Sequence, residues 1–154
     1  MKKDGEGVKI VSKNRKAFFD FDIQERYEAG LVLTGPEVKS VRDGKVSLQE
    51  SYARLRNGEV WVINLDIAPY GHAPTELQEP KRPRKLLLKR SEIHKLTGKT
   101  QERGLTLVPL ALYFKRGFAK LEIGLGRGKS KYDKRASIKK READREIRSR
   151  MLRG

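Results

Sequence analysis

The C-terminal residues 127–154 contain too few apolar side chains to form a folded core of their own. Their large apolar side chains are limited to Tyr132, Ile138, Ile147, Met151 and Leu152, among twelve Lys or Arg and four Asp or Glu. So little apolar burial cannot offset the conformational entropy lost on ordering the chain. We therefore predict a folded body over residues 1–126, with a short flexible N-terminus, and a basic tail over residues 127–154 that is disordered alone.

The charge of the chain indicates a polyanionic partner. The formal net charge is +16, and about half of it lies in residues 1–126 and half in the tail. Such an excess favours nucleic acid or an anionic membrane as the partner. The membrane is the weaker alternative, because no apolar run approaches the roughly 20 residues that a membrane span needs. Residues 1–16 also lack the apolar stretch of a secretory signal, so we expect a cytoplasmic protein without a membrane partner.

The residue types that carry most enzyme chemistry are scarce. The chain has no cysteine and two histidines, His72 and His94, which excludes disulfides, zinc ribbons and iron–sulfur clusters. The string Gly128-Lys129-Ser130 resembles the end of a phosphate-binding loop, but Ile123 stands where that loop needs glycine. We therefore predict no catalytic residue, no metal and no cofactor, and a protein that is not an enzyme.

Alternating apolar residues predict the first long strand. Over residues 18–33, Phe19, Phe21, Ile23 and Tyr27 fall on one face, which predicts a half-buried strand with a bulge at Gly30. A short helix should follow over residues 36–43, starting at a proline and stopping before a glycine.

Two hairpins are predicted further along the chain. Asn57-Gly58 separates strands at 51–56 and 59–67, and in the second strand Trp61, Ile63, Leu65 and Ile67 should point inward. Residues 105–114 and 118–125 form the second hairpin, with Pro109 at an edge or a bulge. Between them lie a proline-rich loop at 69–84 and a helix over 91–96.

Five strands with a helix between the third and fourth are typical of an OB-fold. We therefore predict a mainly β chain folded as a small Greek-key barrel with short helices, although another small barrel stays open. Among its surface residues, Arg82, Arg84, Lys85 and Lys89 form a basic cluster that would contact phosphates or make a solvated rim. Because aromatic residues are few and mostly fall on inward positions, we expect recognition of RNA shape and backbone more than base stacking.

Eight short motifs, in order along the chain, resemble the SsrA-binding protein (small protein B) family. They are Asn14-Arg15-Lys16-Ala17, Glu28-Ala29-Gly30, Gly35-Pro36-Glu37-Val38-Lys39-Ser40, Ser51-Tyr52, Arg84-Lys85-Leu86-Leu87-Leu88, Leu112-Tyr113-Phe114-Lys115, Gly128-Lys129 and Asp133-Lys134-Arg135. The resemblance implies an OB-fold monomer that binds the tRNA-like domain of transfer-messenger RNA and delivers it to stalled bacterial ribosomes. The tail would then enter the decoding region and the empty messenger channel, become helical there, and allow tagging of the nascent chain and release of the ribosome.

The resemblance also implies roles for individual residues. RNA contact maps onto Asn14, Glu28, Leu87, Lys120 and Gly128, and ribosomal accommodation of the tail maps onto Asp133, Lys134 and Arg135. From charge and position we add Lys39, Arg84, Lys85 and Lys129 to the RNA-binding set. Two other functions stay open: a structural ribosomal protein with a basic extension, and an RNA-modifying or RNA-cleaving enzyme.

Overall fold

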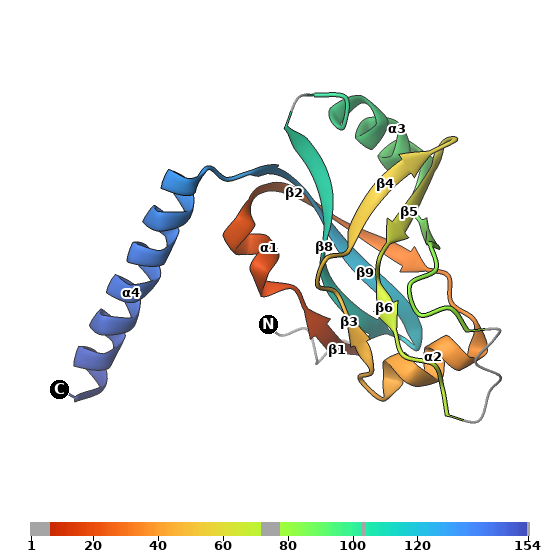
Figure 1. The fold of residues 1–154 in the computed structure, drawn as a ribbon, viewed down its shortest axis with the longest axis horizontal. Helices are drawn as coiled ribbons and strands as arrows, with labels where there is room; N and C mark the ends of the chain where they lie inside the picture. Colours follow the sequence, from red (N-terminus) through yellow and green to blue (C-terminus); the bar gives the residue numbers. More distant parts are fainter. Residues whose placement is uncertain (1–6, 72–77, 103, 154) are drawn as a thin grey trace.

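The chain is mainly β, and its antiparallel strand pairings close on themselves (Figure 1). A computed structural model describes residues 7–71, 78–102 and 104–153. The strands are β1 (Val8–Lys13), β2 (Phe21–Leu31), β3 (Val46–Ser47), β4 (Tyr52–Arg56), β5 (Glu59–Ile63), β6 (Asp66–Ile67), β7 (Arg84–Leu87), β8 (Leu105–Lys115) and β9 (Phe118–Gly128). The large sheet has the order β1-β8-β4-β5-β7-β2-β9, and β9 also pairs with β8. This last pairing leaves β1 outside a closed circuit of the other strands, and closure removes exposed sheet edges.

The inside of this circuit is filled by aliphatic side chains from every long strand. Fully buried members include Val60, Val62, Leu86, Leu112, Leu121, Ile123 and Leu125. Burying one such side chain contributes roughly 1.5–3 kcal/mol, so this core holds the circuit together. Leu121, Ile123 and Leu125 alternate along β9, so one face of that strand points into the core.

The long strand predicted over residues 18–33 begins later than expected. Residues Arg15–Asp20 form the short helix α1, and β2 starts at Phe21. The alternation of Phe18 to Asp22 fits a strand, but Asn14 caps a helix here by accepting a hydrogen bond from the backbone of Ala17. The bulge in β2 lies between Ile23 and Glu25, so its prediction at Gly30 is wrong.

Both predicted hairpins are confirmed, with two-residue turns. Asn57 and Gly58 have φ of 53° and 76°, and Arg116 and Gly117 have φ of 53° and 84°, as type I′ turns require. The predicted inward face of β5 is wrong, however. Val60 and Val62 are buried, which turns Trp61 outward on the same strand.

The cause of this error is a left-handed residue between β5 and β6. Asn64 has φ of 62°, and this turn changes which residues point inward. Leu65 and Ile67 beyond it are buried as predicted, whereas Trp61 and Ile63 before it lie on the outer face. One alternating pattern therefore cannot run through both segments.

Three strands, β1, β3 and β7, were not predicted, and the strand predicted over 59–67 is divided into β5 and β6. β1 adds to β8, and β3 and β6 form a small separate sheet. β7 is short and its first two residues are charged, so it was interpreted only as a basic cluster. It lies between β5 and β2 and completes the closed circuit.

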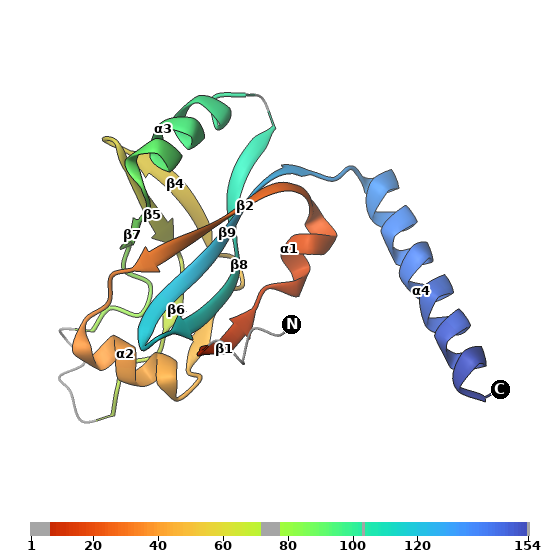
Figure 2. The same cartoon turned by 180° about the vertical axis from the view of Figure 1, so that it is seen from behind.

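Two further helices lie at the ends of the barrel. α3 (Arg90–Lys99) lies at one end of the barrel and α2 (Gly35–Arg42) at the other, as both views show (Figures 1 and 2). The helix over 36–43 is thus confirmed, and α3 continues beyond its predicted end because Gly98 lies inside it. Within the described ranges, no helix is long and apolar enough to cross a lipid bilayer.

Most of the tail forms a single helix, α4 (Lys131–Arg153), which projects from the body beyond α1 (Figure 2). Its first turn contacts α1, where the Lys134 ammonium lies 3.3 Å from an Asp20 carboxylate oxygen. β9 runs to Gly128, so the sheet ends two residues beyond the predicted boundary at 126. Disorder of the free tail stays a prediction.

Candidate nucleic-acid interface

Three residues to which the family resemblance assigned RNA contact line one hollow on the outer face of the barrel. Glu28 from β2, Leu87 from β7 and Lys120 from β9 border a space of about 500 Å³. They meet because β2 lies between the other two strands, and Gly30 stands opposite both Leu87 and Lys120. A Cβ atom at position 30 would lie 3.3 Å from the Cβ of Leu87, so glycine permits this close packing. Leu87 is 54% exposed, which is unusual for leucine and leaves an apolar surface free for a partner.

Glu28 is held as an ionised, partly exposed acceptor. Burial raises the pKa of Glu28, but the Tyr113 hydroxyl and the Lys115 ammonium outweigh that effect, and the pKa lies below its ordinary value. Tyr113 donates a hydrogen bond of 2.5 Å to Glu28 Oε2, and the Lys115 Nζ lies 3.5 Å from the same oxygen. Among the described residues these contacts use Oε2, so Oε1 can accept from an RNA hydroxyl or amino group.

A second hollow of about 450 Å³ shares Glu28 with the first as a lining residue. Its lining includes four cationic side chains, from Lys13, Arg15, Arg26 and Lys115. Glu122 lines the same hollow as a second carboxylate, 4.0 Å from the Arg26 guanidinium. Four cations beside two carboxylates suit a phosphate backbone, while the carboxylates suit polar groups of the sugars and bases. Tyr113 and Lys115 orient Glu28. The sequence analysis named them only as part of a family motif and predicted no role for either residue.

Asn14, Gly128 and Lys129 lie around α1 and do not line either hollow. Asn14 uses both side-chain polar atoms within the protein, because its Nδ2 also donates to the Pro109 carbonyl at 2.9 Å. The Lys129 Nζ donates to the Phe18 carbonyl at 3.2 Å, and its backbone N–H donates to Asp20. These bonds anchor α1, so Asn14 and Lys129 have positioning roles in this structure. Gly128 is exposed, with no atom within 4 Å of where a Cβ would lie.

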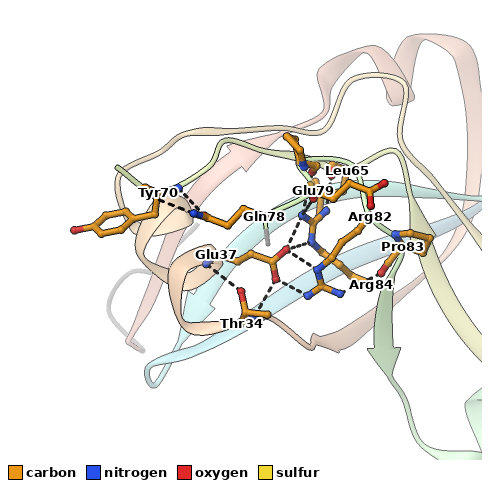
Figure 3. Close-up of polar contacts among 10 residues, drawn as sticks. Thr34, Glu37, Leu65, Tyr70, Gln78, Glu79, Arg82, Pro83 and Arg84 are labelled. Atoms are coloured by element: carbon orange, nitrogen blue, oxygen red, sulfur yellow. Dashed lines mark hydrogen bonds and ion pairs between the residues drawn. The ribbon is translucent and has the colours of Figure 1, made fainter. Parts of the chain in front are cut away.

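Arg84 lies inside the protein, so the prediction that it contacts RNA directly is wrong. Its side chain has no exposed surface, and its Nη2 lies 2.7 Å from Glu37 Oε2 (Figure 3). Its Nη1 also donates to the Leu65 carbonyl at 2.6 Å. A buried guanidinium needs this compensation, since an unpaired buried charge is strongly unfavourable.

Glu37 is the centre of this buried network. Its other oxygen, Oε1, accepts from Arg82 at 2.5 Å and from the Thr34 backbone at 2.9 Å, closing a capping box at the start of α2 (Figure 3). Burial raises the pKa of Glu37, but hydrogen bonds from Arg82, Thr34 and Arg84 outweigh this and hold the pKa below its ordinary value. The network fastens the segment before β7 to α2. The Thr34-x-x-Glu37 spacing was the sequence signal for the cap, which the sequence analysis missed.

The remaining predicted residues lie apart from Glu28. Lys85 pairs with Glu59 at 2.7 Å on the outer surface, and the Lys39 ammonium lies 5.4 Å from the centre of the Tyr70 ring. Lys134 and the exposed Arg135 are on α4, whereas the side chain of Asp133 lies outside the described part. The described residues contain no group of three or more His, Asp or Glu placed to hold a metal ion.

Comparison with known proteins agrees with the motifs. A family model described as "SmpB protein" matches residues 11–153. The chain belongs to the SmpB family. It is 55% identical over 142 residues to an SsrA-binding protein of Desulfitobacterium hafniense, covering 92% of this chain and 91% of the relative. It is 56% identical over 139 residues to an SsrA-binding protein of Carboxydothermus hydrogenoformans, covering 90% and 93%.

A solved SmpB-family structure has a similar fold. It is described as "tmRNA-SmpB: a journey to the center of the bacterial ribosome", shares 46% identity and superposes with a TM-score of 0.66. The match covers 86% of this chain and 94% of the solved one. The family resemblance drawn from the motifs is therefore confirmed, and Glu28, Leu87 and Lys120 lie on the barrel of an SmpB-family protein.

Proposed function

We propose that this protein binds the tRNA-like domain of transfer-messenger RNA and delivers that RNA to stalled ribosomes. The observation that carries the proposal is the grouping of Glu28, Leu87 and Lys120 around one hollow in an SmpB-family chain of net charge +16. We propose that the barrel is of the OB type, supported by its closed antiparallel circuit with α3 preceding the final hairpin. The protein acts as a cytoplasmic monomer.

The barrel supplies affinity and orientation by different groups. The cations around Glu28 neutralise phosphates, which gives affinity that falls with salt but little sequence preference. Leu87 packs against a ribose or base, and Glu28 accepts hydrogen bonds from RNA hydroxyl or amino groups. Because Glu28 repels phosphates, it sets the register in which the RNA backbone can lie.

The tail acts on the ribosome. A helix of 23 residues is roughly 35 Å long, enough to reach a site well away from the barrel. Ribosomal RNA neutralises its cations, and an empty messenger channel is the place where such a helix can be accommodated. The accommodating residues are Asp133, Lys134 and Arg135, after which the nascent chain is tagged and the ribosome released. The protein itself makes or breaks no bond.

Binding to the tRNA-like domain tests the role of the barrel. Glu28→Ala should weaken binding roughly tenfold or more, the typical effect of losing a hydrogen bond to a charged group. Glu142→Ala, the same change at an exposed position on α4, is the matched control and should leave binding unchanged. Both variants should melt near the wild-type temperature. Equal affinity of wild type and Glu28→Ala would reject the proposed interface.

Truncation tests the role of the tail. The truncated protein should end at Ser130, because Lys129 anchors α1 and must be kept. The truncated protein should bind the tRNA-like domain within about threefold of wild type, yet fail to support tagging in a reconstituted translation reaction with stalled ribosomes. Normal tagging by this truncated protein would contradict the proposal.

A further inference from the structure

Trp61 is the single tryptophan of the chain, and it lies on the outer face of the barrel. Its neighbours Val60 and Val62 fill the core, so the indole points away from it and is partly exposed. Tryptophan is usually well buried, because its large ring offers much apolar surface. An outward indole in the middle of a sheet therefore calls for a partner.

Cationic side chains stand on both sides of Trp61. Arg54 on β4 and Lys85 on β7 are its direct cross-strand neighbours. Directly opposed residues on one face have Cβ atoms about 4.5–5.5 Å apart, so both side chains reach the edges of the indole. The surface row is therefore arginine, tryptophan, lysine across three adjacent strands.

A separate hollow of about 500 Å³ opens over Arg54 and Trp61 of this row. Arg54, Arg56, Trp61, Ile63 and Pro83 are among its lining residues, and none of them lines the hollows around Glu28. Its volume lies within the roughly 300–1,000 Å³ typical of small-molecule sites. An object of the size of one nucleotide therefore has room on the indole face.

The charge of this hollow favours an anionic partner. Its carboxylate, from Glu59, is paired with Lys85 at 2.7 Å. Arg54 and Arg56 are exposed, and among the described residues neither has an ion pair with a carboxylate. Two arginines beside an aromatic ring are the combination that single-stranded RNA binds, with the base on the ring and the phosphate on the cations.

Two structural features place this hollow next to the proposed RNA interface. Lys85 and Leu87 both point outward on β7 and are two residues apart, roughly 7 Å along the strand. RNA that contacts Leu87 therefore passes close to Trp61. Pro83 lines the hollow beside Trp61 and lies between Arg82 and Arg84 in the sequence. Because Glu37 holds both arginines in place (Figure 3), this side of the hollow is rigid.

We infer that Trp61, with Arg54 and Arg56 on the neighbouring strand β4, is a stacking site for an unpaired base of the bound RNA. This inference rests on the proposed function, since it assumes that RNA occupies the barrel, and it adds a second contact point across β7. It also revises the expectation from the sequence that RNA shape and backbone matter more than stacking, which depended in part on an inward Trp61.

The single tryptophan makes a direct optical test available. Fluorescently labelled tRNA-like domain is titrated with wild-type protein, and anisotropy of the label reports binding, while tryptophan emission reports Trp61 alone. A base stacked on the indole should quench the emission along the same binding curve. Binding without a change in emission would overturn the inference and leave the proposed function standing. No binding by anisotropy would reject both.

Substitution gives an independent second test. Trp61→Leu keeps apolar contact with the sheet but removes the ring face, and should weaken binding roughly 5- to 150-fold, the range for stacking one base. Trp61→Phe is the matched control because it keeps a ring, and it should stay within about threefold of wild type. Thermal melting confirms that each variant is folded. Unchanged RNA affinity of folded Trp61→Leu would overturn the inference, and weakened ribosome association in that variant would instead identify a ribosome-docking surface.

Discussion

The buried network around Glu37 should contribute far more stability than a surface ion pair of the same geometry. Arg84 and Lys85 are adjacent in sequence, and each has a nitrogen 2.7 Å from a carboxylate oxygen, of Glu37 and Glu59 respectively. The Arg84 side chain has no exposed surface, whereas Lys85 and Glu59 are 39% and 43% exposed. The two pairs therefore share a distance but differ in burial, and Glu37 also accepts hydrogen bonds from Arg82 and Thr34.

Glu37→Gln removes the charge and keeps the shape. It leaves the Arg84 guanidinium buried without a counter-charge, which costs about 3–5 kcal/mol. For a chain of this length each kcal/mol lowers the melting temperature by about 2–4 °C, so the loss should be roughly 6–20 °C. Glu59→Gln breaks a surface pair of about 0–1 kcal/mol and should lower the melting temperature by no more than about 4 °C.

Thermal unfolding followed by circular dichroism measures both variants. Adding Arg84→Met to Glu37→Gln should recover part of the lost stability, because an apolar side chain no longer needs the carboxylate. If Glu37→Gln and Glu59→Gln melted at the same temperature, the central role of burial in this reasoning would be refuted.

Three further results are expected. Gly128→Ala should leave thermal stability unchanged but weaken RNA binding if RNA approaches the backbone there. Gly126→Ala should destabilise the barrel, because its Cβ would lie 3.0 Å from a backbone oxygen. Thermal melting measures the stability of both variants, and anisotropy measures their RNA binding. Because the pKa of Glu37 is lowered in the folded protein, its stabilising effect is complete above its unfolded pKa and is lost as the pH falls through the lower folded pKa. The difference in melting temperature between wild type and Glu37→Gln should therefore begin to shrink below about pH 4 and disappear at more acidic pH. Lys120→Gln should reduce the salt dependence of RNA binding by about one phosphate, while Glu28→Gln should leave that slope unchanged.

Local signals in the sequence were sufficient for much of the barrel. Both hairpins follow from short turn sequences that favour positive φ, and α2 follows from its proline start and glycine stop. The errors arise where a local pattern fits two structures. Phe18 to Asp22 alternate as a strand would, but capping by Asn14 and packing of Ala17 on β8 favour α1 instead.

The site was only partly predictable, because it depends on contacts between distant segments. The family resemblance gave Glu28, Leu87 and Lys120 individually, but only the pairing of β2 with β7 and β9 brings them together. Arg84 was counted as a surface cation because charge says nothing about direction, although it alternates in phase with the buried Leu86. Trp61 was assigned to the core because the left-handed turn at Asn64 leaves no clear signal in the sequence.

Selectivity for a tRNA-shaped ligand tests the central claim most directly. Competition binding at about 0.15 M salt compares the tRNA-like domain with a random RNA duplex of equal length and charge. We expect the tRNA-like domain to bind at least tenfold more tightly, because Glu28 and Leu87 add contacts that phosphate neutralisation alone does not provide. Equal affinity for both RNAs would mean that the barrel binds only charge, and would contradict the account.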